Sequence, residues 1–458
     1  MATAFIIDYE PFDATLPPTT IYGVRVARDN HLETHQVAFE GVVEILTDLI
    51  AKDERVYTID GSQLLASLIW RRLPDARTLC GYIDQRRIVS TDDLTAVLGL
   101  APDARTRYHT DDPATIALQG EALYDQATAT LLASNPHTHP GGINLETLGN
   151  AAALCLSWHG AIIDREMLTR LVHAGRNMAT HIVANLRPNG TIHPVYFRTR
   201  SARFFSRFPA VQSLAVDPFN QHTCPRALVV PAQGHVLAAI DIKSAQLQAI
   251  TATWKKLFPD DHRVASMDNP ADPLDHHQIT GSLLKRLVQL PETAPSREVG
   301  KAVNFCLINC GGVRGMNEIF KNFGYPGTLD QPTFTKVLLM VAERLPVDIW
   351  AQAAAAYCAG GRTTTITGRT FKVKWPGQFS AAHLHALESD AVGIGLLEML
   401  LGWTFPTLLV YDEVLTQVPN VAALQPGTEA FLRGLGRTIP GWNPSLKTTI
   451  YPQHWGVT

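Results

Sequence analysis

The stretch TLLVYDEVLTQV, residues 407–418, places an acidic pair, Asp412 and Glu413, between two apolar runs. This pattern predicts a strand, a tight turn and a second strand. A second apolar run, QGHVLAAIDI at 233–242, predicts another strand and carries Asp241 near its end. An aspartate at the end of an apolar strand is costly unless it is paired, open to a cleft or bound to a metal. Two facing aspartates would suit two Mg²⁺ ions roughly 3.5–4 Å apart in a phosphoryl-transfer site, although either residue alone is better explained as an ordinary turn residue.

The composition limits the class of protein. The chain has 458 residues, of which 46% are hydrophobic and 18% are charged, and this excludes a disordered chain. At roughly 150 residues per domain we expect two or three domains. The net charge of −3 excludes a globally basic nucleic-acid binder, but local basic clusters remain compatible with nucleic acid. No secretory leader, no apolar run of roughly 18 residues and no CxxC pair is visible, so we expect a cytoplasmic protein with reduced thiols and no membrane partner.

A helix is predicted from APSREVGKAVNFCLINCGG, residues 294–312. Arg297, Lys301, Phe305 and Asn309 recur in it at intervals of four, so they share one face. The order cation, cation, aromatic, polar suits a ligand with a charged tail and a flat head, such as a nucleoside triphosphate. A solvated helix would produce the same row by chance, so this pattern alone does not decide.

Taken together, these segments resemble the polymerase domain of the family A DNA polymerases, the DNA polymerase I type. AIDIKSAQLQ at 239–248 resembles the family's motif A, SREVGKAVNFCLIN at 296–309 its motif B, and LLVYDEVL at 408–415 its motif C. Smaller matches follow the expected order: SARFFSRFPAVQS at 201–213, DHHQIT at 275–280, ITGR at 366–369 and HALESDAV at 385–392. The resemblance covers about residues 145–455.

The resemblance implies a template-directed DNA polymerase that transfers a nucleotide from a dNTP to a primer 3′-hydroxyl and releases pyrophosphate. Two Mg²⁺ ions, or Mn²⁺ in their place, would be held by Asp241, Asp412 and the backbone carbonyl of Ile242. The implied catalytic residues are Asp241, Asp412, Glu413 and Lys301, the last as a proton donor to the pyrophosphate. The implied nucleotide-binding residues are Arg297, Lys301, Phe305, His277, Gln246 and Asn309. The implied DNA-binding residues are Arg203, Gln212, Tyr411 and Glu388.

Four of these positions depart from the family pattern. Gln246 stands where the family has a glutamate that helps to exclude ribonucleotides, and Asn309 stands where it has a tyrosine on the template side. Tyr411 replaces a histidine, and Glu388 replaces a glutamine that touches the template. We therefore expect an active polymerase with altered selectivity, which incorporates ribonucleotides to a measurable extent.

A further departure concerns the thumb that grips the duplex. Gly160, Asp164 and Leu168 match the segment that opens the family's thumb, but Ile192 arrives only 28 residues after Asp164. The usual thumb-tip patterns are missing. A reduced thumb predicts few phosphate contacts, weak salt-sensitive binding and low processivity, or the need for a processivity partner.

The N-terminal part resembles, more faintly, the 3′–5′ exonuclease domain that precedes the family's polymerase. Asp8 and Glu10 match its D-x-E metal motif, but Leu64 stands where a second element needs aspartate, and the position four residues before Asp125 holds Glu121 in place of tyrosine. An incomplete ligand set predicts a degenerate domain without proofreading, whose metal site is vestigial.

We therefore expect a multidomain protein that combines the α/β and α+β fold classes. An RNase H-like N-terminal domain at 1–133 and a linker at 134–144 precede a right-hand polymerase domain at 145–458. Within the polymerase domain we expect a reduced thumb at 145–190, an antiparallel-sheet palm at 191–255 and 361–458, and helical fingers at 256–360. The partners would be primer–template nucleic acid and dNTPs, in a host cytoplasm if the chain is encoded by a virus or a plasmid.

Three alternatives stay open. The chain could be an RNA-synthesising, ribonucleotide-tolerant, gap-filling or bypass polymerase. It could be a catalytically dead nucleic-acid-binding scaffold, although a dead scaffold has no need to keep both Asp241 and Asp412. A third alternative, an active nuclease at 1–133 followed by a clamp, is opposed by the incomplete ligand set.

Overall fold

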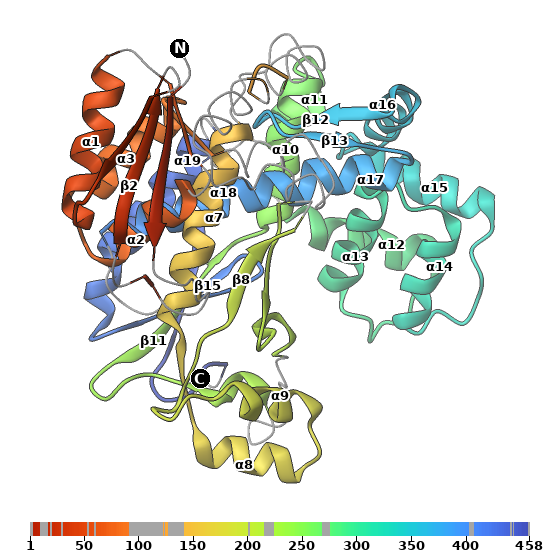
Figure 1. Cartoon of the computed structure of the whole chain (residues 1–458). Coiled ribbons are helices and arrows are strands. Elements are labelled where there is room, and N and C mark those ends of the chain that lie inside the picture. Colours follow the sequence, from red (N-terminus) through yellow and green to blue (C-terminus); the bar gives the residue numbers. More distant parts are fainter. Residues whose placement is uncertain are drawn as a thin grey trace. The chain divides into compact units, whose positions relative to one another are not determined.

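The computed structural model divides into two compact units, each described by itself below (Figure 1). Unit 1 comprises Met1–Ala245, Thr367–Arg369 and Glu388–Thr458, and unit 2 comprises Gln246–Ile366 and Thr370–Leu387. The structure describes residues 3–9, 17–18, 21–28, 31–52, 55–58, 61–90, 122, 124–126, 142–199, 202–214, 224–267, 275–402, 407–439, 442 and 444–456.

Unit 1 begins with a mixed five-stranded sheet whose strand order is β3-β2-β1-β4-β5. Strands β1, β2 and β3 pair antiparallel, whereas β4 and β5 extend the sheet in parallel. Helices α1, α2 and α3 pack beside it, because their apolar positions recur at helical spacing (Figure 1). The elements are β1 (Thr3–Tyr9), β2 (Ile21–Arg28), β3 (His31–His35), α1 (Phe39–Ala51), β4 (Val56–Thr58), α2 (Gly61–Trp70), α3 (Asp75–Asp84) and β5 (Ile88–Ser90).

The next segment of unit 1 begins with α7 (Gly142–His159), which packs against α2. Polar contacts join the two parts: the Ser62 hydroxyl donates to the carbonyl of Thr147 at 3.1 Å, and Arg437 contacts both Asp84 and Glu398 at 2.8 and 2.6 Å. The N-terminal sheet and the remainder of unit 1 are therefore held together by charge as well as by apolar packing.

Two nine-residue helices follow α7. Strand β6 (Ala161–Ile163) leads to α8 (Arg165–His173) and α9 (Asn177–Asn185), and β7 (Thr191–Ile192) closes a three-stranded sheet with order β10-β6-β7. The side chain of Asp164 caps α8 by accepting from the backbone N–H groups of Glu166 and Met167. The sequence of residues 164–186 predicts one helical stretch, but Gly175, whose φ is +68°, separates α8 from α9.

The central sheet of unit 1 is antiparallel, with order β14-β15-β11-β16. It confirms the strands predicted from the two acidic stretches. Its strands are β14 (Thr407–Val410), β15 (Glu413–Val418), β11 (Val236–Ile242) and β16 (Leu446–Tyr451), and β10 (Val229–Val230) precedes β11. Residues 237–240 of β11 are buried, because this strand lies between two neighbours.

A separate two-stranded ribbon, β8 (Val195–Arg198) and β9 (Phe204–Arg207), lies next to this sheet. Along β9 buried and exposed residues alternate, as the period of a strand with one covered face requires. The 3₁₀ turns η1 (Val211–Ser213) and η3 (Pro225–Leu228) follow the ribbon, and helix α19 (Gln425–Thr438) follows β15 and the 3₁₀ turn η5 (Val421–Leu424).

Unit 2 is mainly helical and has its own apolar core. Trp254, Trp350, Phe320 and Phe379 are fully buried in it. Its helices are α10 (Ala245–Leu257, in unit 2 from Gln246 on), α11 (His262–Ser266), α12 (His276–Val288), α13 (Ser296–Ile308), α14 (Val313–Asn322), α15 (Gln331–Ala342), α16 (Val347–Gly360) and α17 (Pro376–Ala381).

The predicted helix at 294–312 is confirmed as α13. The sequence of residues 363–375 also predicts a hairpin, which is confirmed as β12 (Arg362–Thr364) and β13 (Thr370–Lys372). The sequence of residues 334–361 predicts a helical stretch, but it is interrupted between α15 and α16, because Pro346 cannot donate the backbone hydrogen bond that a helix interior needs. A π-helical turn, η4 (Ala382–Ala386), joins α17 to α18 (Leu387–Leu400).

Candidate active site

Three carboxylates meet at one end of the central sheet of unit 1. Asp241 on β11 lies directly opposite Glu413 on β15 in the antiparallel register. Asp412 belongs to the two-residue turn between β14 and β15, because Val410 pairs with Glu413. The turn begins at Tyr411, whose φ of +60° is the left-handed conformation that primed hairpin turns require. The paired strands thus bring together Asp241 and Asp412, which are 171 positions apart in the chain.

The electrostatics of this end are dominated by Asp412. Burial raises the pKa of its carboxyl group, and the neighbouring carboxylates of Glu388, Asp241 and Glu413 raise it further, to about 7. Several negative charges lie close together in a partly desolvated space and repel one another, so removing a proton from Asp412 is unfavourable. A positive charge placed among these carboxylates would reverse that effect.

Glu413 is held by two partners that the sequence did not suggest. Arg226, on η3, donates to both of its carboxylate oxygens at 3.1 and 3.3 Å. The indole N–H of Trp455 donates to Oε1 at 2.9 Å. The guanidinium of Arg226 also lies 4.4 Å from the ring centre of Trp455. These contacts fix the Glu413 side chain, whose exposure is only 19%.

The oxygen donors at this end fit a small hard cation. Mg²⁺ prefers carboxylate and carbonyl oxygens, and it usually takes only one or two carboxylates and completes its shell with water and phosphate oxygens. Asp241 and Asp412 offer such carboxylates, and Ile242 follows Asp241 on the same strand. Within the described ranges no three His, Cys, Asp or Glu side chains converge as a self-sufficient metal site. These donors are therefore of the kind that bind a metal ion together with oxygen atoms of the substrate.

Two of the expected DNA-binding residues lie beside the carboxylates. The guanidinium of Arg203, at the start of β9, is 5.5 Å from the ring centre of Tyr411, and that ring is 52% exposed. Gln212, by contrast, is buried, and its carbonyl oxygen accepts from the backbone N–H and the hydroxyl of Ser206. Its expected contact with DNA stays a prediction. Glu388, at the start of α18, is buried and acts on Asp412 electrostatically.

The expected nucleotide-binding residues gather in unit 2, on α12 and α13. Lys301 is exposed, and no carboxylate of the described chain forms an ion pair with it. Arg297 is also exposed but is paired with Asp275 at 2.9 Å. The half-buried ring of Phe305 lies 5.5 Å from the ring of His277, with 50° between their planes. The predicted row of a cation, a cation and an aromatic ring therefore exists on one helix, with a histidine beside it.

The protonation of His277 follows from its surroundings. Burial lowers the pKa of its imidazole to about 4, and the charges of Arg297 and Lys301 act in the same direction. The side-chain amide nitrogen of Asn304 lies 3.0 Å from Nδ1 of His277 and 3.4 Å from the carbonyl oxygen of His276. An amide that donates to both makes Nδ1 an acceptor, so the proton of the neutral ring lies on Nε2.

The two remaining expected residues of this set lie at helix ends. Asn309 is the C-cap of α13, where its side-chain amide donates to the carbonyl of Phe305 at 2.8 Å. The last carbonyl groups of the helix are also tied down by Trp350, whose indole donates to Ile308 at 2.8 Å. Gln246 lies in the first turn of α10 and is half-buried. The row at intervals of four thus ends at the helix boundary.

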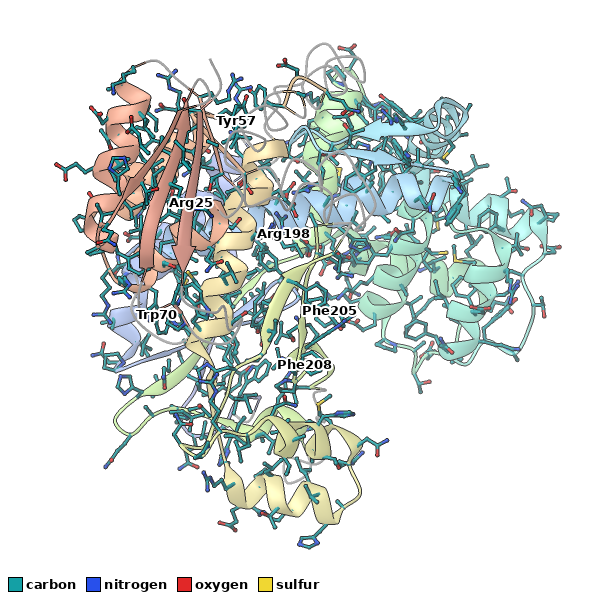
Figure 2. The ribbon with its side chains drawn as sticks, in the orientation of Figure 1. Arg25, Tyr57, Trp70, Arg198, Phe205 and Phe208 are labelled. Atoms are coloured by element: carbon teal, nitrogen blue, oxygen red, sulfur yellow. The ribbon has the colours of Figure 1, made fainter. Side chains whose placement is uncertain are left out.

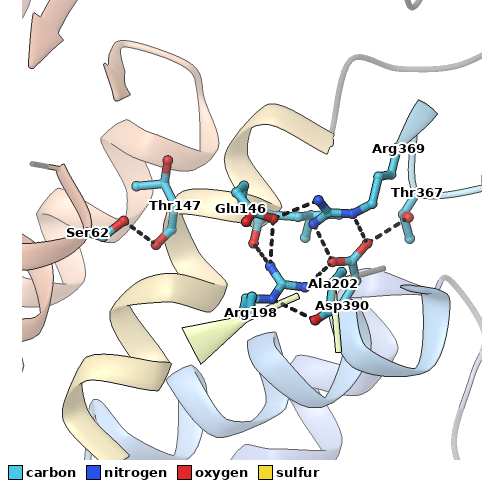
Figure 3. Close-up of polar contacts among 9 residues, drawn as sticks. Ser62, Glu146, Thr147, Arg198, Ala202, Thr367, Arg369 and Asp390 are labelled. Carbon is cyan, nitrogen blue, oxygen red and sulfur yellow. Dashed lines mark hydrogen bonds and ion pairs between the residues drawn. The ribbon is translucent and has the colours of Figure 1, made fainter. Parts of the chain in front are cut away.

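A buried ion network joins α7, β8, α18 and the segment that carries Arg369 in unit 1 (Figure 3). Arg369 contacts Glu146 at 2.6 Å and Asp390 at 2.7 Å, and Arg198 contacts the same two carboxylates at 3.3 and 2.5 Å. All four side chains are at most 8% exposed. Burial opposes ionisation of Glu146 and Asp390, but the two arginines outweigh it and lower the pKa of both carboxyl groups. The hydroxyl of Thr367 completes the network at 3.1 Å from Asp390.

No family model matches this chain, and no curated protein does. Among solved structures, it is similar to the POL domain of Pol1 from M. smegmatis, determined in complex with DNA primer-template and dNTP. The identity is 13% and the TM-score is 0.63, and the match covers 99% of this chain and 95% of that chain. The fold is that of a DNA polymerase domain. This confirms the mixed α/β, multidomain architecture and the polymerase fold expected from the ordered motifs.

The expected exonuclease residues are only partly within the described residues. Asp8 is on β1, the central strand of the N-terminal sheet, but its side chain and Glu10 lie outside the described set. Leu64, which was expected to stand in place of a metal ligand, is 2% exposed in α2. Asp125 is exposed, and Glu121 lies outside the described residues.

Sequence reasoning missed two groups of residues in unit 1. Arg369 lies in the motif at 366–369 and Asp390 in the motif at 385–392. A charged residue within each motif was the sequence signal for a buried ion pair. Arg226 and Trp455 lay in no recognised motif and carried no such signal. The described part of the chain contains no helix long and apolar enough to cross a membrane, and all six cysteines are free thiols.

Proposed function

We propose that this chain is a template-directed DNA polymerase, which joins a dNTP to the 3′-hydroxyl of a primer. The observation that carries the proposal is the acidic end of the central sheet: Asp241 lies opposite Glu413, Asp412 is in the adjoining turn, and burial together with these acidic neighbours and Glu388 raises the pKa of Asp412 to about 7. A fold similar to that of a polymerase domain, solved with primer-template and dNTP, supports the same function.

Asp241, Asp412 and the Ile242 carbonyl would hold two Mg²⁺ ions, which supply charge neutralisation at the reacting phosphate when they are bound. The protein's part is to hold these carboxylates close together at the end of the sheet. Glu413, fixed by Arg226 and Trp455, would stand beside the primer end as an auxiliary carboxylate. Positioning and charge neutralisation account for most of the acceleration of phosphoryl transfer.

Unit 2 would bind the incoming nucleotide. Lys301 and Arg297 would contact the triphosphate, and Lys301 would donate a proton to the departing pyrophosphate. His277 would add a neutral N–H donor from Nε2, because Asn304 occupies its Nδ1 side. Phe305 would pack on the nucleotide. An exposed lysine without an ion pair in the described chain is available for a polyanion, whereas Arg297 must first exchange its contact with Asp275.

Three finer features belong to the same proposal. The short helices α8 and α9 would form a reduced thumb, so synthesis would be distributive or would depend on a partner that supplies the grip. The N-terminal part would be a degenerate exonuclease-like domain without proofreading, since Leu64 replaces a ligand. Gln246 would weaken the discrimination between dNTPs and NTPs.

A primer-extension assay tests the function. DNA and RNA templates are each offered with dNTPs and with NTPs, and Asp412→Ala serves as the inactive control. We expect extension on DNA with dNTPs by the unaltered chain and no extension by the variant. Extension by Asp412→Ala would show that the catalytic assignment is wrong. Binding of primer–template without any extension, over a range of Mg²⁺ and Mn²⁺ concentrations, would favour the dead scaffold.

A further inference from the structure

The β8–β9 ribbon presents aromatic side chains to solvent on one face. Phe197 pairs with Phe205 across the strands, and their ring centres are 5.5 Å apart. Phe205 is 40% exposed, and Phe208, just beyond the end of β9, is 63% exposed (Figure 2). The guanidinium of Arg207 lies 5.1 Å from the ring centre of Phe197. We call Phe197, Phe205, Arg207 and Phe208 the outer ribbon face.

The opposite face of the ribbon is anchored to the carboxylate hairpin. The hydroxyl of Tyr196 accepts from the backbone N–H of Leu409 and donates to its carbonyl, both at 3.0 Å. Leu409 is on β14, immediately before the turn that carries Asp412. At the end of the ribbon nearest this turn, Arg203 lies beside Tyr411. The outer ribbon face is therefore held at a set position next to the candidate active site.

The chemistry of this face favours one kind of ligand. Benzene rings offer neither donors nor acceptors for base edges, so the exposed phenylalanines gain most from another flat ring. Within a duplex the faces of the bases are already stacked on each other, whereas an unpaired base has a free face. Arg207 adds a positive charge, which attracts a phosphate backbone.

We propose that the outer ribbon face binds single-stranded nucleic acid, with unpaired bases stacking on Phe205 and Phe208 and a phosphate near Arg207. This inference extends the proposed function, and depends on it only in taking the bound strand to be the one on which the carboxylates act. It implies that the chain favours substrates with an unpaired stretch next to the primer end over fully paired duplex.

Binding of a fluorescein-labelled oligothymidine of about twelve nucleotides tests the proposal. Anisotropy is measured with the full chain in buffer without Mg²⁺ and without dNTP, and a hairpin duplex of similar length is the comparison ligand. The double variant Phe205→Leu/Phe208→Leu keeps apolar side chains but loses the flat rings, and Phe205→Tyr/Phe208→Tyr keeps the rings. Leu339→Ser removes a side chain that is 60% exposed on α15 and controls for loss of apolar surface.

We expect the leucine variant to bind oligothymidine roughly five- to fiftyfold more weakly than the unaltered chain, because each lost stack weakens binding. The tyrosine variant and Leu339→Ser should bind within about twofold of the unaltered chain. Arg207→Gln should lower the slope of log affinity against log salt by about 0.7, the value for one contact to a single strand. Duplex binding should change less than oligothymidine binding in every ribbon variant.

Unchanged oligothymidine binding by a folded leucine variant would overturn the proposal. An equal loss in the leucine and tyrosine variants would also overturn it, because stacking would then not be the cause. If the leucine variant instead binds normally but loses self-association on size exclusion, the face is an interface between copies. Since these readouts need no synthesis, they are distinguishable from failure of the proposed function, which Asp412→Ala tests in primer extension.

Discussion

The guanidinium of Arg226 donates from one nitrogen to both carboxylate oxygens of Glu413, at 3.1 and 3.3 Å. The two residues are 187 positions apart in the chain, and their side chains are 16% and 19% exposed. A charge pair of this degree of burial depends on both members, because either one alone would be a partly desolvated charge. The pair thus fixes a carboxylate that lies opposite Asp241 in the sheet.

Loss of this pair should reduce synthesis. We expect Arg226→Met to lower kcat in primer extension by about 10–100-fold, because the auxiliary carboxylate of Glu413 would lose the contact that positions it. The kcat of Arg226→Lys should lie between that of Arg226→Met and that of the unaltered chain. Arg170→Met, which breaks the exposed contact with Glu166 at 3.7 Å, is the matched control and should leave kcat unchanged. An unaltered kcat for Arg226→Met, at limiting as well as saturating Mg²⁺, would contradict the positioning role.

The pH dependence of stability should report the raised pKa of Asp412. Between the unfolded pKa near 3.8 and the folded pKa of about 7, the folded state holds a proton that the unfolded state has lost. Stability therefore falls as pH rises through this interval, and the full penalty is present above about 7. Asp412→Asn should remove it, so we expect a gain of about 1–3 kcal/mol in the free energy of unfolding at pH 8 in EDTA.

Urea titrations at pH 5 and at pH 8 provide this measurement. At pH 5 the folded carboxyl group is mostly protonated, so the gain from Asp412→Asn should be smaller than at pH 8. Added Mg²⁺ should raise the stability of the unaltered chain at pH 8 more than that of Asp412→Asn. Equal gains at both pH values would mean that Asp412 is not the group whose ionisation opposes folding.

The buried ion network should be a large contributor to the stability of unit 1. Asp390→Asn leaves Arg198 and Arg369 with one carboxylate between them, so we expect a loss of about 3–5 kcal/mol in the free energy of unfolding. The exposed pair of Arg170 and Glu166 offers a matched control, and Glu166→Gln should cost less than about 1 kcal/mol. Similar small losses for both variants, by urea denaturation, would show that the network is not a supporting element.

Lys301 should matter for nucleotide use more than other exposed lysines do. We expect Lys301→Met to lower kcat/KM for dNTP by roughly 10–10³-fold, because a charge is removed from the proposed triphosphate site. Lys256→Met, on the exposed surface of α10, is the control and should stay within about twofold. Single-nucleotide extension on a primed DNA template measures both. Equal values for the two variants would remove Lys301 from the site.

Sugar selectivity should respond to the residue at position 246. In competition between a dNTP and the matching NTP, the unaltered chain should incorporate measurable ribonucleotide. Gln246→Glu restores the family's residue and should lower the ratio of ribonucleotide to deoxynucleotide incorporation by at least about tenfold. Gln248→Glu, two positions further along α10, introduces the same charge as a control. Strict use of dNTP by the unaltered chain would contradict the expected selectivity.

Much of the local structure could be predicted from the sequence. The apolar runs at 233–242 and 407–418 are the strands β11, β14 and β15, and the row beginning at Arg297 lies on the helix α13. These elements depend on spacing within a short segment, so their hydrophobic periodicity is sufficient. The polymerase fold was also expected, because seven motifs occur in one order, and the structural comparison confirms that fold. Helix ends at Gly175 and Pro346 were missed, since helical periodicity continues on both sides of them.

Only the tertiary structure determined the contacts between residues that are far apart in the chain. Arg226 and Trp455 reach Glu413 from positions 187 and 42 residues away, and Arg198 reaches Asp390 from 192 residues away. The anchoring of the aromatic ribbon to Leu409 spans 213 residues. Short-range patterns determine which face a side chain takes on its own element. Which other charge or ring it then meets depends on the packing of the elements, and this packing also sets the pKa of Asp412.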